Sequence, residues 1–280
     1  MDLEKEYWNE QKKNYDSLTY ENDKKYYSWQ PARWAGNDVA INLISKYLKD
    51  VNTTLEIGAG SAAFSIALYN YNNNINPTAI DISPAAYDYA NQILKDLNIP
   101  VNYKIYDLFK FNEKADLVLS LGVIEHYDKV KMENFIKKCI DLSNKYILIC
   151  IPNQESIFFK NYVSWSEKLS KKYVEKHQKL TNGDLKKLLE KMNLKIILED
   201  GFQVFLSESK FLSEDTKNNL DMINDIRKSI SKYDENLASE YPNKNFSMED
   251  IKTLTLSELN LSKEERMKYS FMTFILAEIK

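Results

Sequence analysis

The chain has 280 residues, 44% of them hydrophobic and 28% charged, which is the composition of a globular protein able to bury one good core with an elaborated cap. A net charge of −3 argues against broad non-specific binding to nucleic acid. Two Cys and two His residues make a Cys/His zinc site unexpected. No apolar run approaches the roughly 20 residues that span a bilayer, and the N-terminus is polar, so we predict a cytoplasmic protein without membrane contact.

The first segment, residues 1–50, is rich in Tyr and Trp interleaved with charged residues, and Trp29 lies near its middle. Apolar residues then recur at helical spacing over 31–49, which predicts a helix that packs on the first strand's sheet. The aromatic residues are equally consistent with a lid over a binding pocket, to which Trp29 would contribute, and with a packing arm.

The chain is organised around residues 55–64, an apolar run that passes into a small-residue turn and then into a helical pattern. This order predicts a buried parallel strand, a tight bend and the start of a helix. Gly58 and Gly60 allow the backbone to bend sharply and to approach a ligand closely. Glu56 stands just before them, where a carboxylate would repel a pyrophosphate and suit a cation.

The pattern E-x-G-x-G after a strand resembles motif I of the class I S-adenosylmethionine (SAM)-dependent methyltransferases. SAM carries a sulfonium and an ammonium and no phosphate. The resemblance implies that Glu56, Gly58, Ala59 and Gly60 border SAM. Ala62 stands where that family often has a third glycine, which would place the helix slightly farther from the ligand.

Acidic residues also end the next two predicted strands. Asp81 follows the apolar run from residue 78, and a carboxylate at this place in such a sheet accepts hydrogen bonds from ribose hydroxyls. The resemblance implies that Ile82 and Leu108 border the cofactor and that Asp107 contacts the adenine amino group. Asp107 is equally suited to cap the turn that follows it.

Residues 115–127 form a second signature, an apolar strand that ends in Ser-Leu-Gly and turns into Ile-Glu-His. It resembles motif IV of small-molecule methyltransferases, which implies that Ser120 and Leu121 run past the sulfonium. His126, with Glu125 beside it, is the candidate base, because a neutral imidazole can take a proton from a hydroxyl. The alternative is that the Glu-His pair only closes the turn. The turn lacks the extra acid of metal-binding relatives, so no metal is expected.

Five repeats of strand then helix predict an α/β, doubly wound, Rossmann-like sheet. The resemblance implies seven strands, the last of them antiparallel and inserted between strands five and six. We divide the chain into an N-terminal helical lid (1–50), a SAM-binding core (51–200), a helical insertion (201–265) and a last core strand (266–280). The insertion is either a cap for acceptor recognition or a dimer contact, which leaves monomer and homodimer both open.

The segment after strand five, residues 153–180, carries aromatic residues that include Trp165, together with His177. Ligands in this fold bind beyond the carboxyl ends of the strands, so Trp165 and His177 are candidates for substrate binding. Residues 160–195 also hold an excess of Lys, which is either a solvated face or an attraction for an anionic acceptor.

The sequence therefore predicts a SAM-dependent methyltransferase with a small-molecule acceptor, a hydroxyl oxygen being favoured. N-methylation, or an acceptor that is nucleotide-linked, a tRNA or a protein, remains an alternative. A NAD-dependent oxidoreductase shares the fold but suits Glu56 poorly, and a non-catalytic SAM-fold partner protein would usually lose the acidic glycine turn, which is intact here.

Overall fold

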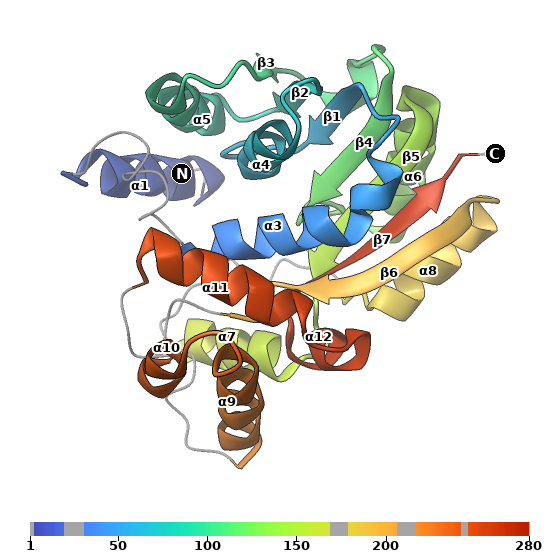
Figure 1. Cartoon of the computed structure of the whole chain (residues 1–280). Helices are drawn as coiled ribbons and strands as arrows, with labels where there is room; N and C mark the ends of the chain where they lie inside the picture. The colour runs from blue at the N-terminus through green and yellow to red at the C-terminus, as the bar shows by residue number, and fades with distance from the viewer. Residues whose placement is uncertain (1–2, 20–30, 169–178, 206–216, 242–245, 280) are drawn as a thin grey trace.

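The computed structural model describes residues 3–19, 31–168, 179–205, 217–241 and 246–279, which form a seven-stranded sheet flanked by helices (Figure 1). The strand order is β3-β2-β1-β4-β5-β7-β6. The strands are β1 (Thr53–Ile57), β2 (Asn76–Asp81), β3 (Asn102–Ile105), β4 (Ala115–Leu121), β5 (Ser143–Pro152), β6 (Lys195–Phe202) and β7 (Met272–Glu278). Strand β7 runs antiparallel between β5 and β6, while β1 to β5 pair in parallel. The predicted doubly wound fold and its antiparallel last strand are thus confirmed.

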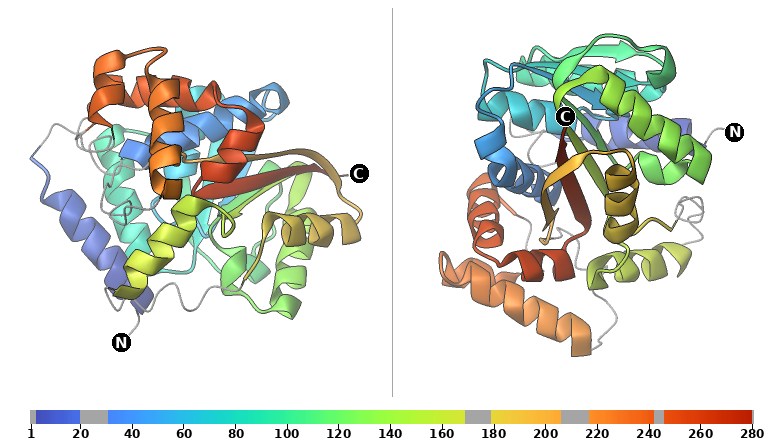
Figure 2. Two further views of the ribbon diagram at one scale, coloured as in Figure 1. Left: turned by 90° about the horizontal axis from the view of Figure 1, so that it is seen from below. Right: turned by 90° about the vertical axis from the view of Figure 1, so that its right-hand side faces the viewer.

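Helices cover both faces of this sheet, with α3, α4 and α5 on one side and α6 and α8 on the other (Figure 2). The described helices of the core are α1 (Leu3–Asp16), α3 (Pro31–Ile44), α4 (Ala63–Tyr71), α5 (Pro84–Leu97), α6 (Lys129–Leu142), α7 (Ile157–Lys168) and α8 (Asn182–Lys191). Short 3₁₀ turns follow α3 (η1, Ser45–Tyr47), β3 (η2, Leu108–Lys110) and β4 (η3, Ile124–His126). None of the described helices is long and apolar enough to cross a membrane.

The period-two alternation of strand side chains builds a hydrophobic core on each face of the sheet. On β4, Leu117 and Leu119 pack with α3 and α4, whereas Val118 packs with α6 and α8. All three side chains are fully buried. A strand with apolar residues on both faces is expected for the centre of a parallel sheet covered on both sides. The order of strands reverses between β1 and β4, where ligands bind in open α/β sheets.

The insertion forms a separate helical layer below the sheet as seen in Figure 1. It contains α9 (Lys217–Ile230), α10 (Glu235–Glu240), α11 (Met248–Leu259) and α12 (Lys263–Tyr269), so it extends past residue 265, where the sequence analysis ends it. Its own buried cluster includes Met222, Ile226 and Leu254, and takes in Ala35 from α3 and Phe158 from α7. Because α3 and α7 belong to the core, the insertion rests on the core through apolar packing.

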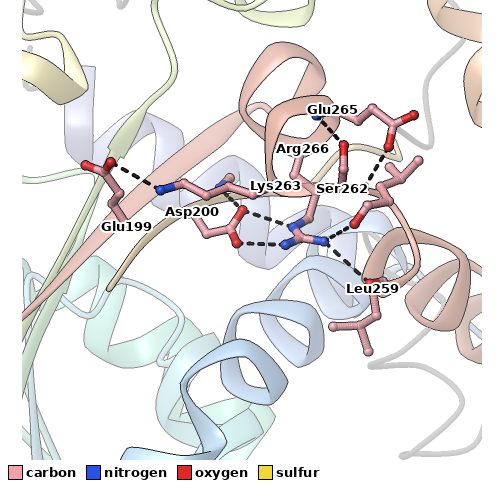
Figure 3. A network of polar contacts seen from close by, with 9 residues as sticks. Glu199, Asp200, Leu259, Ser262, Lys263, Glu265 and Arg266 are labelled. Carbon is pink, nitrogen blue, oxygen red and sulfur yellow. Dashed lines mark hydrogen bonds and ion pairs between the residues drawn. The ribbon is translucent and has the colours of Figure 1, made fainter. Parts of the chain in front are cut away.

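A buried ion pair also ties the insertion to the sheet (Figure 3). Arg266 of α12 donates from Nε to Oδ1 of Asp200 at 3.0 Å and from Nη2 to Oδ2 at 2.7 Å. The two side chains are 7% and 4% exposed, and Nη1 of Arg266 reaches the carbonyls of Leu259 and Leu261. Such a two-pronged pair fixes orientation as well as distance, so α12 is held in one position against β6.

Candidate functional site

The turn between β1 and α4 is bent by three left-handed residues at alternate positions. Gly58, Gly60 and Ala62 have φ values of +64°, +52° and +56°. The two glycines adopt this conformation without steric cost, whereas Ala62 pays roughly 1–2 kcal/mol for it. Between them the N–H of Ala59 donates to the carbonyl of Ile80 at 3.1 Å, which fastens the turn to β2. The predicted glycine bend therefore exists, and Ala62 shares its left-handed geometry.

Glu56 joins the end of β1 to the first turn of α4. Its Oε2 accepts the backbone N–H of Ser65 at 2.9 Å and the hydroxyl of Ser65 at 2.5 Å. The side chain is 4% exposed, and burial raises the pKa of Glu56 to about 7, against the lowering effect of the two hydrogen bonds. The carboxylate thus fixes the position of α4 relative to the turn.

Asp81 ends β2 with its carboxylate directed at the same turn. Its Oδ2 accepts the backbone N–H of Gly60 at 2.9 Å, and its Oδ1 accepts the backbone N–H of Ser83 at 2.8 Å. Burial raises the pKa of Asp81, and these amide hydrogen bonds oppose the rise. An ionised carboxylate has about four acceptor positions, so the backbone N–H groups that bond Asp81 leave it capacity to accept from a ligand hydroxyl.

Three further residues predicted to border the cofactor follow β2 and β3, and they differ in exposure. Ile82 is 68% exposed although it is a large apolar residue, while Leu108 is buried. Asp107 caps η2, because its Oδ1 accepts the N–H of Phe109 at 3.0 Å. The capping role that the sequence left open for Asp107 is therefore present, and its half-buried carboxylate also stands at the end of β3.

The end of β4 meets the glycine turn at the point where the strand order reverses. A Cβ on Gly58 would overlap Cγ2 of Val123, so the second signature packs directly on the first. Ile57 pairs with Ser120, whose hydroxyl is fully buried and has no hydrogen-bond partner among the described residues. Leu121 follows, partly buried, and ends the strand.

Glu125 and His126 point in different directions from the 3₁₀ turn η3. Glu125 is 1% exposed, its Oε2 has no hydrogen-bond partner among the described residues, and burial raises its pKa to about 8. His126 is exposed, and partial desolvation lowers its pKa against the effect of a hydrogen bond with the backbone of Gly122. A neutral imidazole exposed beyond the carboxyl end of β4 can accept a proton, whereas a buried protonated carboxyl cannot.

Residues 55–144 match the family model of a methyltransferase domain. This segment is about a third of the chain and runs from β1 to the start of β5. It contains the glycine turn, Asp81, Asp107 and the Glu-His pair. A search of curated proteins found no match to the sequence.

Solved structures resemble this chain in fold. The plantazolicin methyltransferase BpumL, in complex with a triazolic desmethylPZN analog and S-adenosylhomocysteine (SAH), is 15% identical, with a TM-score of 0.56 over 97% of this chain and 90% of BpumL. The mitomycin 7-O-methyltransferase MmcR is 16% identical, with a TM-score of 0.50 over 61% of this chain and 50% of MmcR. At these identities the likeness concerns the fold alone.

The structure does not describe the side chains of the three predicted substrate-binding residues, Trp29, Trp165 and His177. Trp29 and His177 fall outside the described residues. Trp165 belongs to α7, but its side chain is not among those described. Their roles stay predictions. Among the described residues, no group of three or more His, Cys, Asp or Glu side chains is arranged to hold a metal ion.

Tyr103 and Val123 contact the turn but were not predicted from the sequence as site residues. Tyr103 of β3 donates its hydroxyl to the carbonyl of Gly60 at 2.8 Å, and Val123 covers Gly58. Tyr103 is an ordinary strand residue in the sequence, and no local pattern marks it, because its partner lies 43 positions away. Val123 could have been found, since it follows the strand that pairs with β1.

Proposed function

We propose that this chain is a SAM-dependent methyltransferase that methylates a hydroxyl oxygen of a small-molecule acceptor. The cofactor lies beyond the carboxyl ends of β1, β2 and β4, where the strand order reverses. This is the place at which open α/β sheets bind ligands.

One observation carries the proposal: two buried acids, Glu56 and Asp81, flank the glycine turn. Glu56 and Asp81 are held by hydroxyl and backbone N–H donors, and neither forms an ion pair with Lys, Arg or His among the described residues. Burial raises the pKa of both. Asp81 suits a ribose in either cofactor, so Glu56 decides: a carboxylate just before the glycines disfavours a pyrophosphate there, whereas a cationic ligand lowers the cost of ionising it. The site therefore favours SAM over a dinucleotide.

The residues of the turn suit the parts of SAM. The carboxylate of Asp81 suits the ribose hydroxyls, since its backbone partners do not exhaust its acceptor positions. The exposed side chain of Ile82 offers an apolar surface for the adenine ring, and Asp107 an acceptor for its amino group. The left-handed conformation of Gly58 and Gly60 gives the turn its sharp bend at the carboxyl end of β1. SAM, when bound, supplies an activated methyl group to a nucleophile.

His126 supports a hydroxyl as the acceptor. An alcohol must lose its proton as its oxygen is methylated, and a neutral imidazole takes such a proton. The lowered pKa of His126 keeps the ring neutral near pH 7, and the residue is exposed beyond the carboxyl end of β4. Glu125 precedes it and is buried, so in this proposal Glu125 shapes the turn while His126 removes the proton.

The comparisons support the reaction class. The matched family is described as a methyltransferase domain, and its segment contains every residue assigned here to the cofactor. The fold is shared with methyltransferases over nearly the whole chain in the case of BpumL. BpumL was crystallised with SAH, and MmcR is described as an O-methyltransferase.

Calorimetry tests the cofactor. We expect SAM and SAH to bind at one site per chain, and NAD⁺ to give no heat at the same concentration. Binding of NAD⁺ without SAM would assign the chain to the dehydrogenases. No binding of any of the three would favour a non-catalytic partner protein.

A labelled-methyl assay tests the acceptor class. The protein is incubated with SAM carrying an isotopic methyl group and a cell extract separated by size into small molecules, RNA and protein. We expect label in the small-molecule fraction, and we expect it to be stable to treatments that hydrolyse esters. Label confined to RNA or to protein would contradict the small-molecule acceptor while leaving the methyltransferase assignment intact.

A further inference from the structure

The N-terminal helix α1 lies outside the matched segment 55–144, yet it touches the glycine turn. A Cβ on Gly60 would overlap Cη2 of Trp8 and would lie 2.8 Å from Cζ2 of the same ring. The benzo ring of Trp8 thus fills the space that any other residue at position 60 would need. In Figure 1 the arrowhead of β1 points toward the side of the molecule where α1 lies.

Helix α1 is anchored by a buried tyrosine, so the position of Trp8 is determined by packing. Tyr15 is fully buried, donates its hydroxyl to Asp96 of α5 at 3.0 Å and meets the ring of Tyr89 edge-on at 6.0 Å between centroids. Trp8 itself packs near Tyr89, with 6.1 Å between ring centroids. Two aromatic contacts and one hydrogen bond therefore hold α1 along α5.

Every group of Gly60 is engaged by a different element. Its N–H bonds to Asp81 of β2, its carbonyl accepts the hydroxyl of Tyr103 of β3, and its Cα faces Trp8 of α1. Trp8 and Asp81 consequently contact the same residue. Since Asp81 is the residue proposed to hold the cofactor's ribose, the indole of Trp8 stands at the boundary of that site.

We propose that Trp8 is a cofactor-binding residue, whose indole forms the wall of the SAM site beside Gly60, so that α1 completes a site begun by the matched domain. This inference rests on the proposed function. Trp offers a large rigid apolar surface at low entropic cost and a ring face that attracts cations. In the opposite arrangement, the indole occupies space that the cofactor needs, and removing it would tighten cofactor binding.

Calorimetric titration with SAH separates the two. We expect Trp8→Ala to weaken SAH binding at least 10-fold while the wild type binds normally. An unchanged or tighter dissociation constant in a folded Trp8→Ala variant would overturn the inference, and tighter binding would identify Trp8 as an obstruction. If the wild type itself binds no SAH, the proposed function fails, and that result is distinct from any effect of Trp8.

Trp8→Phe keeps an aromatic ring but withdraws the atoms that reach Gly60, and it guards against loss of folding in the alanine variant. We expect Trp8→Phe to weaken SAH binding and to lose most of the change in tryptophan emission that SAH causes in the wild type. A wild-type dissociation constant together with a wild-type emission change would overturn the inference.

Leu18→Ala provides the matched control. Leu18 packs on the same cluster as Trp8 and Tyr15, but the three atoms nearest the Cβ position of Gly60 all belong to Trp8. We expect this variant to bind SAH within 2-fold of the wild type. Equal weakening by Leu18→Ala and Trp8→Ala would show a general effect of loosening α1, and would overturn a specific role for the indole.

Discussion

Gly60 donates its backbone N–H to the Asp81 carboxylate at 2.9 Å, and this bond joins the glycine turn after β1 to the end of β2. The two residues are 21 positions apart, and neither is available to the other until the parallel sheet has formed. The bond places an acceptor group beside the point where the strand order reverses. The proposed cofactor site depends on this relationship more than on any other.

Replacing Asp81 with Ala removes the acceptors for two backbone amides and for the proposed ribose. We expect SAH binding to fall by at least 10-fold, measured by calorimetry, and Asp81→Asn to fall between the wild type and the alanine variant. Asp116→Asn is the matched control, because Asp116 also accepts two backbone N–H groups, from Asn52 and Thr53, but at the opposite end of the sheet. Equal losses for Asp116→Asn and Asp81→Ala would mean that only folding is affected.

His126 is predicted to act on turnover and not on cofactor binding. We expect His126→Ala to lower kcat by roughly 10²-fold, the usual contribution of a general base, with an unchanged dissociation constant for SAH. The base form is the neutral ring, which is lost as pH falls through the pKa. Since that pKa lies below its ordinary value of 6.5, kcat should decline only at pH values below 6.5. If His126→Ala and Asp81→Ala behave alike, His126 is not the base.

Two ion pairs on β6, Asp200–Arg266 and Glu199–Lys263, are expected to contribute very differently to the free energy of unfolding. Replacing Arg266 with Ala leaves a buried carboxylate without its partner, which costs about 3–5 kcal/mol in the free energy of unfolding. Lys263→Ala is the control, since Lys263 pairs at 3.2 Å with Glu199, where the side chains are 49% and 25% exposed. Such a pair contributes about 0–1 kcal/mol. Urea denaturation of both variants measures the difference, and similar losses would contradict the structural account.

Glu125 predicts a pH dependence of stability. Burial raises its pKa to about 8 in the folded chain, from an ordinary value of 4.5. Between these values the folded state holds a proton that the unfolded state releases, so its contribution to stability falls as pH rises, by at most about 1.4 kcal/mol per pH unit. Cys150, whose pKa is also raised by burial and by Glu125, stays protonated throughout.

Glu125→Gln cannot ionise and should lack that decline. We expect its free energy of unfolding, relative to the wild type, to increase between pH 5 and pH 8. Glu113→Gln, at a surface carboxyl that is 65% exposed, serves as the control and should show little change. A Glu125→Gln difference that is the same at both pH values would show that Glu125 is not protonated in the folded chain.

The sequence predicted those features that depend on neighbouring residues. Gly58 and Gly60 indicated a sharp bend, and both are left-handed in the structure. The strand-helix repeats indicated a doubly wound sheet, and the structure has one. The cap of η2 by Asp107 was also among the alternatives, because capping depends on residues only two positions apart.

The contacts that close the site come from residues far apart in sequence, and no local pattern announces them. Trp8 contacts Gly60, and Tyr103 hydrogen-bonds to the same glycine. Away from the site, Arg266 likewise pairs with Asp200, 66 positions away. The sequence could place an aromatic residue in the N-terminal segment, but not choose Trp8 from the other aromatic residues there. These long-range contacts depend on how the helices pack on the sheet, and the hydrophobic periodicity of a single helix or strand does not predict that packing.

A crystal structure of the protein with SAH tests the central claim most directly. The account predicts SAH beyond the carboxyl ends of β1 and β2, with its ribose hydroxyls within hydrogen-bonding distance of Asp81 and its adenine over Ile82. Crystals grown in saturating SAH that show no ligand at the glycine turn, or show it bound elsewhere, would contradict the assignment.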